Sequence, residues 1–237
     1  MRLWAGLGLA LMLAGCVEAL PPVQNMPQVV PVAQTVLPPA SALANFQTVV
    51  ARLEPVAERA CRDLGRVRNC DFRIVIDDRP NQPPNAFQTL DSAGRPILAF
   101  STALIADAHN ADELAFVIGH EAAHHILGHI PQAEQKAMTG ALLAGVIASA
   151  SGLGQAGIEQ AQQMGAVVAA RSYSKEFELQ ADALGTEVAF YAGYDPVKGS
   201  AFFDRLPDPG DKFLGSHPAN AERKAVVRRV MAELSGQ

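Results

Sequence analysis

One helix with a strong cap and a regular apolar pattern constrains the fold of this chain more than any other feature. Asn110 has the position of an N-cap, and Glu113 stands three residues later, as in a capping box. Apolar residues recur from Leu114 to Ile118, and we expect the helix to extend from Ala111 to about Gly128. Because such a helix is amphipathic, one side of it has to pack against the rest of a folded domain.

Short β segments precede this helix, and further helical segments follow it. Strands are expected at residues 72–76, 86–90 and 96–101, of which the last two should form a hairpin. Other helices are expected at residues 42–64, 173–191 and 219–234, with Pro55 kinking or restarting the first of them. Strands gathered early and helices gathered late indicate an α+β fold, mostly helical with a small antiparallel sheet.

Length, charge and cysteine content suit an ordinary globular protein. The chain has 237 residues, enough for one domain with a sizeable core and some appendages. Its net charge of −5 is mild and gives no sign of a surface for nucleic acid, so no such partner is expected. Only three cysteines occur, which excludes a small protein built on disulfides.

The first residues have the features of a targeting segment. Arg2 supplies positive charge, and the apolar stretch Leu3–Leu13 is too short to span a bilayer. Residues 13–16, Leu-Ala-Gly-Cys, resemble the bacterial lipobox, in which a signal peptide (here residues 1–15) is removed and the cysteine thiol, here of Cys16, is diacylated. An ordinary secretory signal with an incidental cysteine is the alternative.

An acylated Cys16 would hold the chain to a membrane that the chain does not span. The rest of residues 16–41 is rich in proline and favours an extended spacer, which leaves residues 42–237 for the folded domain. Val17 and Glu18 follow the cysteine without an aspartate, and by resemblance to the sorting rule of Gram-negative bacteria this favours the outer membrane. The expected location is the bacterial cell envelope, on its periplasmic side.

The other two cysteines, Cys61 and Cys70, would then lie in an oxidising compartment. They flank a turn-like stretch that contains Gly65 and connects the first helix to the first strand. We predict a disulfide between them that closes this connection. Two reduced cysteines are the alternative.

Residues 120–124 carry the clearest chemical signal, the pentapeptide His-Glu-Ala-Ala-His on the capped helix. The spacing puts His120 and His124 on one face of the helix, one turn apart, where both imidazoles can bind one Zn²⁺. Glu121 points to the side of that face, where it can accept a proton from a water molecule. Histidines with a purely structural role would leave a carboxylate and two imidazoles on a half-buried face without purpose.

A downstream carboxylate is the best candidate for the third ligand. The metzincin pattern would need a histidine six residues after His124, where the chain has Ile130. Glu178, on the expected helix 173–191, would complete a His₂Glu site with an open fourth position. Asp182, one turn further, could accept a hydrogen bond from the far nitrogen of a ligand histidine and fix its tautomer.

The stretch 137–158 is uncharged, weakly hydrophobic and interrupted by glycines. Small-residue helices packed over the metal site, or a mobile lid, are favoured over a hairpin inserted into the membrane.

Short motifs occur in a characteristic order at residues 85–87, 112–115, 120–129, 173–175, 178–182, 192–196 and 216–218, with Arg223. In these motifs the sequence resembles the gluzincin family of the CAAX prenyl protease and the heat-shock protease HtpX, and within that family the branch of small bacterial envelope lipoproteins. The resemblance covers roughly residues 46–235. Lys175 stands where relatives usually carry arginine, which leaves the metal site untouched. The chain lacks the four or more spanning segments of the integral-membrane members, which argues against prenylated substrates in a bilayer chamber.

The resemblance implies roles for individual residues. His120, His124 and Glu178 would hold one zinc ion per chain, and Glu121 would be the general base. His217 would lie near the metal in a loop, where it either stabilises the oxyanion or caps the zinc in a resting state. His125 and His129 fall off the shared face and are expected to be structural or solvent-facing.

The expected function is that of a membrane-anchored periplasmic zinc metalloendopeptidase that clears misfolded envelope proteins. The strand around Ala86 and Phe87 could hold an extended polypeptide substrate by backbone hydrogen bonds. One alternative is a chaperone-like factor that works with the outer-membrane assembly machinery and has a self-capped or structural zinc site. A metal-dependent amidase or peptidoglycan hydrolase is disfavoured, because the motifs match a peptidase throughout.

Overall fold

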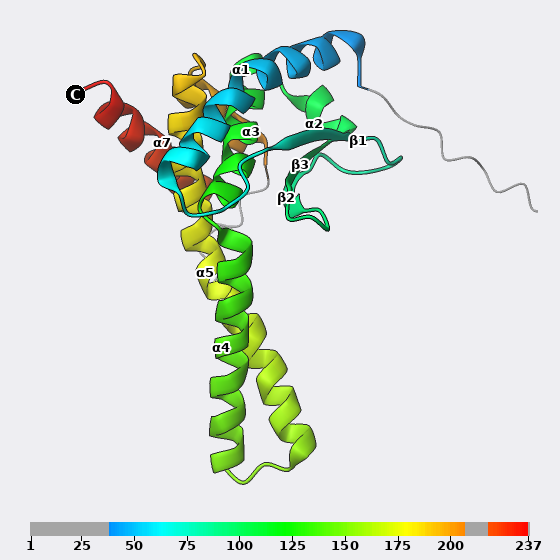
Figure 1. The fold of residues 1–237 in the computed structure, drawn as a ribbon, viewed down its shortest axis with the longest axis vertical. Helices are drawn as coiled ribbons and strands as arrows, with labels where there is room; N and C mark the ends of the chain where they lie inside the picture. Colours follow the sequence, from blue (N-terminus) through cyan, green and yellow to red (C-terminus); the bar gives the residue numbers. More distant parts are fainter. Residues whose placement is uncertain (1–37, 207–217, 237) are drawn as a thin grey trace, which may run out of the picture. The chain divides into compact units, whose positions relative to one another are not determined.

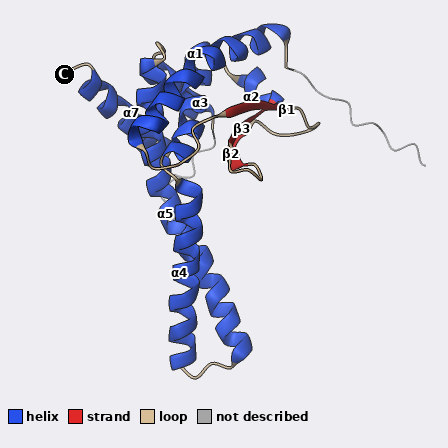
Figure 2. Cartoon of the chain, viewed as in Figure 1, coloured by secondary structure: helices blue, strands red, loops and turns tan. Residues whose placement is uncertain are grey.

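The computed structural model describes residues 38–206 and 218–236, apart from the side chains of residues 170–174. Within these ranges the fold is mostly helical with one small sheet (Figure 2). The elements in chain order are α1 Ala40–Leu64, β1 Arg73–Asp77, β2 Ala86–Leu90, β3 Pro96–Ser101, α2 Thr102–Asp107, α3 Ala111–Ile126, α4 His129–Ala150, α5 Gln155–Tyr191, α6 Pro196–Gly199, the 3₁₀ helix η1 Ser200–Arg205 and α7 Asn220–Leu234.

The sheet is mixed, which corrects the expectation of an antiparallel one. β2 and β3 form the predicted antiparallel hairpin, with Phe87 opposite Ala99. β1, however, pairs in parallel with β3, with Ile74 opposite Leu98, so β3 is the central strand. The connection 78–85 carries the chain past β3, which puts β1 and β2 on opposite sides of it. β2 is therefore an edge strand.

The helix that the sequence pattern emphasised, α3, lies in the core and packs against α1, α5 and the sheet (Figure 1). Ile118 and Ala122 of α3 are fully buried beside Leu53 of α1 and Ala181 of α5. The cap differs in one detail from the prediction. The side chain of Asn110 accepts a hydrogen bond from the N–H of Glu113, but the Glu113 carboxylate accepts from the N–H of His109.

The ends of α1 and α3 are both set by glycines in the left-handed region. α1 continues through Pro55 without restarting and ends at Gly65, which has a φ of 61°. Gly128, with a φ of 69°, separates α3 from α4, so the helix expected to reach Gly128 ends at Ile126. A left-handed backbone costs glycine nothing, which is why the chain turns at these points.

A long helical hairpin follows α3. The sequence predicted a helix over residues 173–191, but α5 begins at Gln155, and its first half pairs with α4. Figure 1 shows these two helices side by side, joined by a short turn. Among the described residues, no helix is long and apolar enough to cross a bilayer.

The structure joins Cys61, at the end of α1, to Cys70, just before β1, in the predicted disulfide. Cys61 is buried in the main core, so the bridge fastens the loop between α1 and the sheet to the body of the domain.

Candidate metal centre

The two helices that carry the candidate ligands cross with their backbones in contact. Gly119 of α3 and Gly185 of α5 meet at the crossing, and a Cβ on Gly185 would lie 2.7 Å from the backbone nitrogen of His120. Any larger residue would push the helices apart. Because Glu178 and Asp182 lie two turns and one turn before Gly185, this close crossing brings their carboxylates to the histidines of α3.

His120, His124 and Glu178 converge on one point. Nε2 of His120 is 3.1 Å from Nε2 of His124, and the Glu178 carboxylate oxygens lie 3.5 Å and 3.4 Å from these two nitrogens. Among the described residues, these three are the group of metal-ligating side chains that could hold one ion.

The spacing of these atoms fits zinc. Ligand atoms about 2.0–2.2 Å from a tetrahedral zinc ion are about 3.3–3.6 Å apart, close to the distances between the three side chains. Two imidazoles and one carboxylate are also a donor set that suits zinc and leaves a fourth position open. A bound ion would therefore be held by His120, His124 and Glu178.

A buried carboxylate orients the first ligand. Nδ1 of His120 donates to Oδ1 of Asp182 at 2.9 Å, which leaves Nε2 of the ring free to bind a metal. Burial alone would lower the pKa of His120, but hydrogen bonds to Asp182 and Glu178 outweigh it and raise that pKa to about 10. The carboxylates thus favour positive charge at this position, which is what a divalent cation supplies.

Arg223 of α7 holds that carboxylate in place. Its Nε and Nη2 both donate to Asp182 at 2.7 Å, a bidentate pair, and its guanidinium lies over the ring of Phe203 at 4.1 Å. Burial alone would raise the pKa of Asp182, but hydrogen bonds from His120 and Arg223 lower it, so the carboxylate is ionised. The sequence pointed to Arg223 as a matching position but gave it no role.

The second ligand has an orienting chain of its own. Nδ1 of His124 lies 2.9 Å from Nδ1 of His129, whose Nε2 is 3.2 Å from Oε1 of Gln180. His129 is only 3% exposed and stacks on Phe177. Burial and the neighbouring His124 lower the pKa of His129 to about 4, so its ring is neutral and can accept a hydrogen bond. Of the two expected environments, structural or solvent-facing, His129 has the first, because it is buried and contacts a ligand histidine.

His125 has a separate, structural environment. It is buried, its Nε2 lies 2.6 Å from the backbone oxygen of Asn69, and its ring meets Phe72 edge to face. It ties α3 to the loop that the disulfide closes, as expected of a histidine off the metal face.

A cleft of about 550 Å³ opens beside the three ligands. Glu121 lines it next to His120 and His124, and burial raises the pKa of its carboxyl group. A carboxyl group with a raised pKa next to a metal site is suited to accepting and returning a proton.

One wall of the cleft is the edge strand. Five consecutive residues, Pro84 to Gln88, line it, and they include Ala86 and Phe87 of β2. Among the described strands, β2 pairs with β3 alone. The cleft therefore joins a metal-binding point, a carboxylate beside it and a stretch of edge-strand backbone.

The model of Peptidase family M48 matches residues 47–231. The match spans most of the chain and includes all three converging side chains. The chain belongs to peptidase family M48. A comparison with curated proteins found no match.

Membership of family M48 makes the chain a metallopeptidase, a hydrolase of peptide bonds. Peptidases of family M48 depend on a metal, typically zinc, and the His₂Glu group is compatible with that ion. The structure brings together His120, Glu121, His124, Glu178 and Asp182. His217 and Cys16 lie outside the described residues.

Proposed function

We propose that this metallopeptidase is a zinc endopeptidase, tethered by an acylated Cys16 to the periplasmic side of the bacterial outer membrane, which degrades misfolded envelope proteins. The convergence of His120, His124 and Glu178 beside Glu121, in a cleft walled by an edge strand, carries the endopeptidase part of the proposal. The lipobox and the proline-rich spacer support the location.

A zinc ion bound by the three ligands would polarise the scissile carbonyl and make a water molecule more acidic. The Glu121 carboxylate accepts the proton of that water and later passes it to the leaving amine. Asp182 keeps the ring of His120 in the tautomer that binds metal, and Arg223 keeps Asp182 in position.

An edge strand suits an extended polypeptide. Residues 84–88 line the cleft and lead into the edge strand β2, so a substrate chain can add to β2 through main-chain hydrogen bonds. Because such bonds do not depend on side chains, binding of this kind tolerates many sequences. That tolerance suits an enzyme that clears unfolded proteins, and an extended segment within a chain is what an endopeptidase needs to bind.

The test is a comparison of wild type with Glu121→Gln. The variant keeps the three ligands, so we expect it to hold one zinc ion per chain and to have no detectable cleavage of casein. In cells it should trap envelope proteins that the wild type removes. A Glu121→Gln variant that still cleaves casein would refute the assignment of Glu121 as the base.

The location and the alternative role have separate tests. The mass of the mature chain tells whether Cys16 begins it and carries acyl groups, and fractionation of the envelope tells which membrane holds it. If Glu121→Gln supported the assembly of outer-membrane proteins as well as wild type does, while no cleaved protein accumulated in either strain, a chaperone-like role would replace the proteolytic one.

A further inference from the structure

The hairpin of α4 and the first half of α5 carries its large apolar side chains on the outside. Met138, Leu142, Leu143, Val146 and Ile147 recur along one side of α4, and each is between 58% and 73% exposed. Most of the large hydrophobic residues exposed in the described part of the chain belong to this hairpin. A concentrated apolar surface of this kind marks a site of contact with a protein or a membrane.

The inside of the hairpin is built from small residues. Gly140 of α4 and Gly165 of α5 face each other, and a Cβ on Gly165 would lie only 2.5 Å from that of Ala144. A helical hairpin that is stable in water would place leucine and valine between its helices and polar residues on the outside. Here the arrangement is reversed, with small residues inside and large apolar ones outside, as in helices that pack together in lipid.

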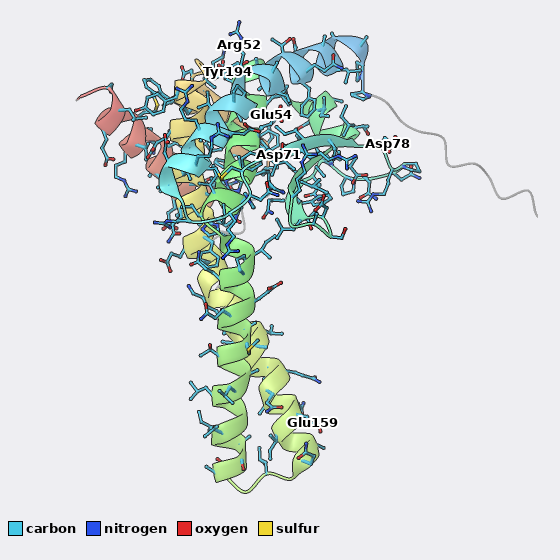
Figure 3. All side chains as sticks on the ribbon, viewed as in Figure 1. Arg52, Glu54, Asp71, Asp78, Glu159 and Tyr194 are labelled. Atoms are coloured by element: carbon cyan, nitrogen blue, oxygen red, sulfur yellow. A yellow bond between two sulfur atoms is a disulfide. The ribbon has the colours of Figure 1, made fainter. Side chains whose placement is uncertain are left out.

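Charge is absent from the same stretch. No charged residue occurs between Lys136 and Glu159. Glu159 itself lies near the turn of the hairpin (Figure 3). The exposed side of α5 near that turn carries Gln160 and Gln163 instead. The hairpin is thus apolar along α4, and along α5 it is polar but almost uncharged only from Gln155 to Gln163, since Met164 and Val167 are exposed beyond that point. That suits an element that lies in the surface of a bilayer and does not cross it.

A bilayer is within reach if Cys16 is acylated. Residues 17–39 separate that cysteine from the start of α1, and a chain of this length extends at most about 80 Å, at roughly 3.3–3.6 Å per residue. α4 has 22 residues and is therefore about 33 Å long. The tether thus leaves the domain enough freedom to lay the hairpin on the membrane that holds it.

We propose that the apolar side of α4, from Met138 to Ile147, lies among lipid chains at the bilayer surface. The proposal rests on the membrane anchor of the proposed function for its setting, but the hairpin binds lipid by its own side chains. Because the surface is uncharged, the binding should depend on the apolar contact alone. It should be insensitive to salt and to the charge of the lipid headgroup.

The test uses residues 17–237, which lack the signal peptide and the acylated cysteine but contain every residue of the core. Trp4 is the chain's single tryptophan, so this fragment has none, and Leu143→Trp introduces a unique fluorophore. With vesicles of phosphatidylcholine alone, we expect its emission to shift to the blue and to be quenched by brominated lipid. Gln160→Trp, on the polar side, should keep the emission of a water-exposed ring.

Partition coefficients measure the contribution of the apolar side. In the same fragment, Leu143→Gln with Ile147→Gln should lower the partition into phosphatidylcholine vesicles by about tenfold for each side chain removed. Gln160→Glu with Gln163→Glu is the matched control and should change it little, as should added phosphatidylglycerol or salt. Circular dichroism and urea unfolding of each variant verify that the domain is folded.

Several results would overturn the proposal. They are an unchanged emission of Leu143→Trp with every vesicle, a binding that salt abolishes, or a blue shift caused by unfolded casein or by self-association without lipid. A mature chain without acyl groups on Cys16 would refute the anchor. It would leave the vesicle result standing, because the fragment carries no anchor.

Discussion

His129 is predicted to control zinc affinity without touching the metal. Its Nδ1, 2.9 Å from Nδ1 of His124, is the acceptor that keeps the proton of His124 on the side away from the metal. His129→Phe preserves the ring that stacks on Phe177 but removes this acceptor. The N–H of His124 is then left unpaired, or the proton moves to Nε2, where zinc has to displace it.

The magnitude follows from the loss of one hydrogen bond at a partly buried group. Leaving such a donor unsatisfied costs about 1–3 kcal/mol, which corresponds to a loss of roughly 5- to 150-fold in zinc affinity. Substitutions of residues that orient metal ligands typically cost about 10- to 100-fold, in the same range. His129→Asn keeps an acceptor oxygen near the place of Nδ1 and should recover most of the affinity.

Competition for zinc between the apo protein and a chromophoric chelator measures this effect. The matched control is His125→Phe, which replaces a buried histidine of α3 that bonds to Asn69 and not to a ligand. It should lower the free energy of unfolding and leave the zinc affinity unchanged. If His129→Phe bound zinc as tightly as wild type, or if His125→Phe lost as much affinity, the orienting role of His129 would be wrong.

Three further predictions concern the framework of the site. Gly185→Ala places a Cβ 2.7 Å from the backbone nitrogen of His120, so the free energy of unfolding in urea should fall by about 1–3 kcal/mol and zinc should bind more weakly. Gly154→Ala, a position with open space around it, should change neither quantity. Equal effects of the two substitutions would contradict the close crossing. Burial alone would raise the pKa of Glu113, but hydrogen bonds from Arg205 and His109 lower it below its ordinary value. The stabilising contribution of the Glu113 carboxylate is therefore complete above the ordinary pKa of about 4.3, and it is lost as the pH falls through the lower pKa of the folded state. Glu113→Gln should therefore be less stable at neutral pH, by a difference that shrinks in acid; a constant difference would refute the ion pair's role. Cys61→Ser with Cys70→Ser should lower the free energy of unfolding by about 2–3 kcal/mol, as loop closure over so few residues predicts, and a reductant should destabilise the wild type alone.

Features that depend on neighbours in the chain were the ones that the sequence could predict. The capped helix, the i, i+4 histidines and the β2–β3 hairpin follow from short-range patterns, and each is present. Glu178 was a candidate as a carboxylate on a downstream helix, the family resemblance implied it as a ligand, and Asp182 was placed by lying one turn further on the same face. The disulfide followed from its short loop and the expected compartment.

Features that depend on contacts between distant segments could not be predicted. The parallel pairing of β1 with β3 is set by the course of the connection between them. The role of Arg223 depends on α7 packing against α5, and that of His129 on the turn at Gly128, which directs its ring back to His124. Helical periodicity places His129 off the ligand face, but it does not reveal that the ring lies beside Nδ1 of His124.

The small-residue helices of the hairpin were expected, but their position away from the metal site was not. The outward residues of the hairpin are apolar and its inward residues small, so its hydrophobic pattern is not that of a helix packed in a water-soluble core. The favoured interpretation, small-residue helices or a lid over the metal site, finds no support in the cleft, since no described residue from 131 to 169 lines it.

A titration of metal-free protein with zinc, followed by casein hydrolysis in the same sample, tests the central claim most directly. The account predicts that the rate rises in proportion to added zinc and stops rising at one ion per chain. Glu178→Ala should bind zinc far more weakly and remain inactive in the same titration. Hydrolysis that needs no zinc, or a Glu178→Ala variant that binds and cleaves like wild type, would contradict the assignment of this site.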